Sequence, residues 1–159
     1  MIFVTLGSQK FQFNRLLKKI DQLIAEKFIT EPVFAQTGYS DYKPRYFAYR
    51  SFLDREEFEK QTAEADIVIT HGGTGAIIGA VKKGKKVIAV PRRAKYGEHV
   101  DDHQLQLVGQ FRELNLICEC KDCDCLGEAL RDVKTRTFDR YESNTATIIE
   151  SIDRFIESL

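Results

Sequence analysis

A strand–turn–helix–strand pattern over residues 65–91 limits most strongly what this chain can fold into. Residues 67–69 are a β-branched apolar run typical of a buried strand, and residues 87–90 form a second such run, closed by a proline. The helical pattern between them covers residues 76–83 and stops at Gly84, where a left-handed residue is favoured. A crossover of this kind makes its two strands parallel, so the pattern predicts a βαβ unit.

The turn that opens this helix, residues 70–75, reads Thr-His-Gly-Gly-Thr-Gly. Glycines let the backbone approach a bulky anion, and a helix N-terminus offers unpaired N–H groups with a partial positive charge. We therefore expect a phosphate or diphosphate here, with His71 donating to it and Thr74 capping the helix or binding an oxygen. A tight turn without a ligand is the alternative, because the spacing matches neither the dinucleotide fingerprint nor a Walker loop.

The remaining pattern predicts a doubly wound α/β domain that covers residues 1–159. Predicted strands and helices alternate along most of the chain, and Asp54 and Glu57 form the expected N-terminal capping pair of the second helix. The other predicted strands are 2–6, 33–36, 46–50 and 116–120, and the other predicted helices are 13–28, 55–65, 104–113, 125–133 and 145–159.

Composition excludes several classes of protein. The formal net charge is zero at pH 7, so bulk charge gives no strong attraction to nucleic acid or to a membrane. No apolar run approaches the roughly 20 residues that span a bilayer, and the N-terminus lacks the features of a signal peptide. We expect a cytosolic protein that binds no nucleic acid.

All four cysteines lie within residues 118–125, in the order Cys-Glu-Cys-Lys-Asp-Cys-Asp-Cys. A thiolate metal site is one interpretation. Against it, two of the cysteines fall at the end of a predicted strand and two at the start of a predicted helix, and no second cluster completes a site. The pattern favours reduced thiols without a metal.

A polar loop follows the strand at 87–90. Residues 92–104 contain two of the three histidines, three carboxylates and three cations. Such a run is often only a solvated loop, but this one leaves the carboxyl end of a central strand, where open α/β sheets bind ligands. We expect it to take part in binding.

Three blocks together resemble the C-terminal, donor-binding half of a GT-B glycosyltransferase of the family 28 type. They are residues 4–9, residues 65–75 with 87–91, and residues 101–104. The resemblance covers nearly the whole chain and is strongest to short stand-alone forms, the PssE-like and CpsG-like subunits of bacterial polysaccharide synthesis and the catalytic subunit of the eukaryotic two-subunit UDP-GlcNAc transferase.

The resemblance implies a role for each block of residues. The loop before the second helix would meet uracil through backbone groups at Phe52 and Leu53. His71 and His103 are candidate catalytic residues. The donor diphosphate would lie against Gly7, Ser8, Gln9, His71, Gly72, Gly73, Thr74 and Gly75. The sugar would contact Glu98, Asp102, His103 and Gln104.

Two further implications concern what the chain lacks. Family members often place a glutamate four residues after the last turn glycine to hold the ribose, whereas this chain has Gly79 there. The resemblance also implies no cofactor and no obligatory metal, because helix N–H groups and a nearby histidine or arginine can stabilise the charge of the diphosphate.

The resemblance also implies a partner. A GT-B enzyme closes a cleft between two domains and this chain supplies one, so a membrane-anchored subunit would bring the other half and hold the complex at the inner membrane face. The expected activity is sugar transfer from a UDP-sugar to a polyprenyl-diphosphate-linked sugar in capsule or exopolysaccharide synthesis. Three alternatives remain open: a non-catalytic nucleotide-binding module, a thiol-metal protein, and a self-contained homodimeric transferase. The residues do not specify the sugar.

Overall fold

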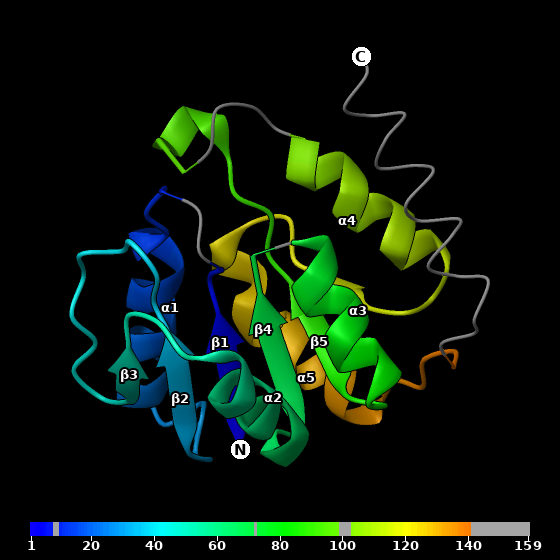
Figure 1. Cartoon of the computed structure of the whole chain (residues 1–159), viewed down its shortest axis with the longest axis horizontal. Helices are drawn as coiled ribbons and strands as arrows, with labels where there is room; N and C mark the ends of the chain where they lie inside the picture. Colours follow the sequence, from blue (N-terminus) through cyan, green and yellow to red (C-terminus); the bar gives the residue numbers. More distant parts are fainter. Residues whose placement is uncertain (8–9, 72, 99–102, 141–159) are drawn as a thin grey trace.

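The computed structural model describes residues 1–7, 10–71, 73–98 and 103–140. Within these residues, six parallel strands form one sheet in the order β3-β2-β1-β4-β5-β6 (Figure 1). The strands are β1 Ile2–Thr5, β2 Val33–Gln36, β3 Ala48–Arg50, β4 Ile67–Thr70, β5 Lys86–Ala89 and β6 Cys118–Glu119. The order runs outward from β1 to β3 and then from β4 to β6, as in a doubly wound fold.

Helices cover both faces of the sheet, which confirms the predicted fold class. The described helices are α1 Asn14–Ala25, α2 Arg55–Glu64, α3 Thr74–Lys82, α4 His103–Glu113 and α5 Leu126–Thr135, with 3₁₀ turns η1 Ala94–Tyr96 and η2 Cys123–Cys125. Figure 1 shows α2 and α3 in front of the sheet and α1 and α5 behind it.

Alternate residues of β1 point into two separate apolar cores. Ile2 and Val4 belong to the core that α1 and α5 cover, whereas Phe3 belongs to the core that α3 and α4 cover. Each of these side chains is at most 1% exposed. Burial of both faces explains why the central strands read as continuous apolar runs rather than as alternating ones.

The helix ends follow local chemistry. The side chain of Asp54 accepts a hydrogen bond from the Glu57 N–H at 2.8 Å, as the capping pattern predicts, while the Glu57 carboxylate accepts from Gln61. Gly84 takes the predicted left-handed conformation at φ 71° and closes α3 with a Schellman motif. In that motif the N–H of Lys85 donates to the Ala80 carbonyl.

Other predicted boundaries shift by a few residues. Helix α1 ends at Ala25 rather than at residue 28, because Lys27 adopts a positive φ and turns the chain back on the helix. Strand β6 contains two residues instead of five, although Leu116 and Ile117 before it are buried. The predicted helix at 145–159 lies outside the described residues. Among the helices that are described, none is long and apolar enough to cross a bilayer.

Candidate functional site

The loops after β1 and β4 meet at the centre of the carboxyl edge of the sheet. These strands are neighbours with Thr5 opposite Thr70, and the strand order reverses between them. Open α/β sheets bind their ligands at such a reversal, so the topology brings together the two turns that the sequence singled out.

The imidazole of His71 is packed between the glycines of the two turns. A Cβ atom added to Gly7 would lie 2.6 Å from Nε2, and one added to Gly73 would lie 2.5 Å from Cε1. Gly7 also has a φ of +72°, which L side chains rarely adopt. His71 is 6% exposed. Both positions therefore require glycine while the ring occupies this space.

Helix α3 begins directly behind this histidine. Its N-cap residue is Gly73 and its first helical residue is Thr74, two residues earlier than predicted. The expectation that Thr74 caps the helix is wrong, because a residue at the first helical position cannot act as the N-cap. No side chain caps this helix within the part of the chain that the structure describes. An oxygen ligand for Thr74 stays a prediction, as do the diphosphate contacts of Gly7, Gly73 and Gly75.

Two residues that follow β5 complete the buried network around His71. The side-chain oxygen of Gln104 accepts from the backbone N–H of Arg92 at 3.3 Å, and its nitrogen lies 3.4 Å from Nδ1 of His71. Gln104 is 4% exposed. The sequence predicted Gln104 to contact the sugar, but the structure joins it to the predicted phosphate-binding histidine.

Arg92 is a buried cation that the sequence did not single out. Its side chain is fully buried, and Nη2 donates to the Leu6 carbonyl at 2.6 Å. Among the described residues, Nε and Nη1 have no hydrogen-bond partner. Burial lowers the pKa of Arg92 to about 10, so the guanidinium is charged at neutral pH. Positive charge therefore lies beside the first turn, and no carboxylate of the described residues is bonded to it.

Glu98 does not have the role that the sequence predicted. It is 1% exposed, and its carboxylate accepts from the Arg93 N–H at 3.0 Å and from two nitrogens of Arg15 at 3.1 Å each. A carboxylate held by three protein donors is not presented to a sugar hydroxyl. Instead, Glu98 anchors the loop after β5 to Arg15 of α1. The guanidinium carbon of Arg15 also lies 4.3 Å from the centroid of the Tyr96 ring, in the same loop.

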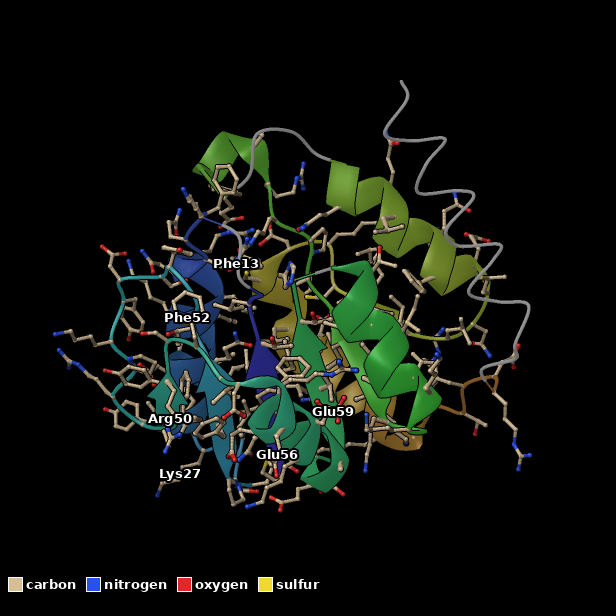
Figure 2. The ribbon with its side chains drawn as sticks, in the orientation of Figure 1. Phe13, Lys27, Arg50, Phe52, Glu56 and Glu59 are labelled. Atoms are coloured by element: carbon tan, nitrogen blue, oxygen red, sulfur yellow. The ribbon has the colours of Figure 1, made fainter. Side chains whose placement is uncertain are left out.

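An exposed aromatic pair lies at the ends of β2 and β3. Phe52, which Figure 2 labels, is 48% exposed. Its ring contacts that of Tyr39 edge to face, with the two ring centroids 5.3 Å apart. Leu53 packs against the second apolar core. Uracil binding by Phe52 and Leu53 stays a prediction, and the sequence missed Tyr39, because it follows a turn glycine in a loop with no apolar period.

Several predicted site residues cannot be placed. Ser8, Gln9, Gly72 and Asp102 lie outside the described residues. His103 is the first residue of α4, but its side chain is outside the description as well. A Cβ at Gly79 would meet no atom within 4 Å among the described residues, so the missing glutamate leaves open space there.

Three of the four cysteines lie in the protein interior. Cys118, Cys120 and Cys123 are buried and Cys125 is exposed. Burial raises the pKa of Cys120 and of Cys123 to about 12, so both remain thiols at neutral pH, and Cys120 donates to the Asp122 carbonyl. Within the described ranges, no three potential ligands converge on a metal position.

The parallel sheet, its strand order and the glycine turns at the reversal define a Rossmann-like domain of the kind that forms half of a GT-B fold. The chain belongs to the glycosyltransferase family 28 C-terminal domain family, whose profile matches residues 1–159.

Individual relatives agree with this assignment. The human UDP-N-acetylglucosamine transferase subunit ALG13 is 29% identical over 142 residues, which cover 80% of this chain and 12% of that protein. The solution structure of ALG13 has a TM-score of 0.59 at 18% identity and covers 95% of this chain and 93% of that one. The Streptomyces glycosyltransferase SsfS6, crystallised with thymidine diphosphate, has a TM-score of 0.57 at 18% identity, covering 99% of this chain and 37% of that one.

Proposed function

We propose that this chain is the donor-binding subunit of a glycosyltransferase that uses a UDP-sugar and completes its active site with a partner. The observation that carries the proposal is the packing of His71 between Gly7 and Gly73, at the strand reversal and at the start of α3. Family membership supports it, as do the name of the human relative, a UDP-N-acetylglucosamine transferase subunit, and the thymidine diphosphate bound to a protein of this fold.

The chemistry of the site suits a diphosphate leaving group. Sugar transfer breaks the bond between the anomeric carbon and the diphosphate, so negative charge grows on the phosphate oxygens. The N-terminal N–H groups of α3 and the buried guanidinium of Arg92 stabilise that negative charge as it develops. Because these groups are fixed by the fold, they need no reorganisation during the reaction.

The proposal includes a partner and an acceptor. The chain matches 37% of SsfS6, which supports a partner that supplies the other half of the cleft. We propose a membrane-anchored subunit, a polyprenyl-diphosphate-linked sugar as acceptor, and action at the cytoplasmic face in capsule or exopolysaccharide synthesis. Asp102 and His103 remain proposed sugar contacts, with His103 a candidate for catalysis.

Calorimetric titration of UDP into the Gly73→Ala and Gly109→Ala variants tests the donor site. A Cβ at position 73 overlaps the His71 ring, whereas one at position 109, inside α4, would have its nearest described neighbour, the Glu119 carboxylate, at 4.0 Å. We expect Gly73→Ala to weaken UDP binding at least about tenfold, or about 1.4 kcal/mol, and Gly109→Ala to bind as the wild type does. Equal affinities for all three proteins, or no binding of UDP by the wild type together with its partner, would refute the proposal.

The two-subunit claim needs a separate measurement. Transfer from a UDP-sugar to a lipid-linked acceptor should require both the chain and membranes that contain the partner. Full transfer by the purified chain alone would contradict the claim and would favour a self-contained transferase.

A further inference from the structure

The two ring nitrogens of His71 face different surroundings. Nδ1 lies 3.4 Å from the side-chain nitrogen of Gln104, whereas Nε2 lies against the glycines of the two turns, 2.6 Å from the position that a Cβ atom of residue 7 would take and 2.8 Å from that of residue 73. A neutral imidazole carries its proton on only one nitrogen, so the surroundings of Nδ1 determine what Nε2 can do.

A backbone N–H fixes the orientation of the Gln104 amide. The N–H of Arg92 can only donate, and it lies 3.3 Å from Oε1 of Gln104. Rotating the amide by 180° would set its NH₂ group against that donor, so the oxygen faces Arg92 and the NH₂ group faces His71. Since an NH₂ group can only donate, Nδ1 has to accept and therefore carries no proton.

Because the three residues are buried, their hydrogen-bond partners are fixed. Arg92 is fully buried, Gln104 is 4% exposed and His71 is 6% exposed, so water cannot readily replace a lost partner. The two charged side chains at the ends of the 92–98 segment have other partners: the Arg92 guanidinium is bonded to the Leu6 carbonyl, and the Glu98 carboxylate is paired with Arg15.

We propose that Gln104 is a positioning residue that holds His71 as the neutral tautomer with its proton on Nε2. The ring thereby presents an N–H donor at the glycine turns, and the role of this donor as a diphosphate ligand rests on the proposed function. The inference also separates the two candidate catalytic histidines. A nitrogen that already carries a proton cannot accept another, so Nε2 of His71 does not act as the general base.

Nitrogen-15 spectroscopy of the histidine side chains tests this directly in the free protein. The chain contains three histidines, and single His71→Asn, His99→Asn and His103→Asn variants assign their signals. We expect a pyridine-type signal at Nδ1 of His71 and a pyrrole-type signal at Nε2. A proton on Nδ1 in the wild type would overturn the proposal, whatever the variants do.

Two substitutions on α4 extend the test. Gln104→Glu removes the NH₂ donor and supplies an acceptor, so we expect Nδ1 of His71 to change from pyridine-type to pyrrole-type. Gln110→Glu adds the same charge at an exposed position on the same helix and should leave the ring signals unchanged. An unchanged Nδ1 signal in folded Gln104→Glu, or the same change in Gln110→Glu, would overturn the role of Gln104.

Addition of UDP separates this proposal from the functional one. If UDP binds at the turns, the Nε2 signal of His71 should shift in the wild type. Failure of UDP to bind would count against the proposed function alone, because the tautomer is read in the free protein.

Discussion

Replacing Gly7 with alanine should destabilise the fold more than the same replacement at Gly84. The two glycines have nearly the same φ, +72° and +71°, so both variants carry the cost of a left-handed alanine, about 1–2 kcal/mol. They differ in the space for the new Cβ. At Gly7 it would lie 2.6 Å from Nε2 of His71, whereas at Gly84 nothing described lies within 4 Å.

The difference between the two variants isolates the contact with His71. Overpacking a buried site costs roughly 1–3 kcal/mol, so we expect a total loss of about 2–5 kcal/mol for Gly7→Ala and about 1–2 kcal/mol for Gly84→Ala. Urea denaturation followed by circular dichroism measures both free energies of unfolding.

A double-mutant cycle completes this test. In a His71→Ala background the ring is absent, so the cost of Gly7→Ala should fall to that of Gly84→Ala. If Gly7→Ala and Gly84→Ala cost the same within about 0.5 kcal/mol, the limit of additivity for independent sites, the packing of His71 against the first turn is wrong.

Two further predictions concern groups away from the site. Burial raises the pKa of Cys120 and Cys123 from 9.0 to about 12, so between these pH values the folded state keeps protons that the unfolded state loses. The free energy of unfolding should therefore fall as the pH rises from 9 to 12, by up to about 1.4 kcal/mol per pH unit for each thiol. Urea melts of the wild type and of the Cys120→Ala, Cys123→Ala double variant measure this slope, and an equal slope in both proteins would disprove it. The buried carboxylate of Asp21 accepts from the Tyr42 hydroxyl at 2.6 Å and from the N–H groups of Arg45 and Tyr46, so Asp21→Ala should cost about 2–4 kcal/mol, while alanine at exposed Asp124 should cost less than about 1 kcal/mol. The Asp21 bond also raises the pKa of Tyr42, and a spectrophotometric titration in which removal of Asp21 leaves that pKa unchanged would contradict the contact.

Local patterns predicted most of the fold. The apolar runs of β1, β4 and β5 are long enough to indicate burial on both faces. The crossover between β4 and β5 required these two strands to be parallel. Boundaries were less accurate, as at α3, where the glycine-rich stretch carries little apolar periodicity and the first two helical residues were missed.

The site was harder to predict because its contacts join distant parts of the chain. The polar composition of residues 92–98 indicates solvent exposure, yet Arg92 and Glu98 are among the most deeply buried residues. Their partners lie far away in sequence, Leu6 for Arg92 and Arg15 for Glu98. No spacing rule identifies a pair more than 80 residues apart, so only the folded chain reveals which charges are enclosed.

The attachment of Glu98 to Arg15 has a consequence for how a second protein would dock on this edge. Because residues 92–98 are held against α1 in the unbound chain, this part of the rim is preorganised. A partner would contact a segment that is already ordered. Binding would therefore not include the entropic cost of fixing these seven residues. Association through this rim should therefore resemble the docking of rigid bodies rather than folding upon contact.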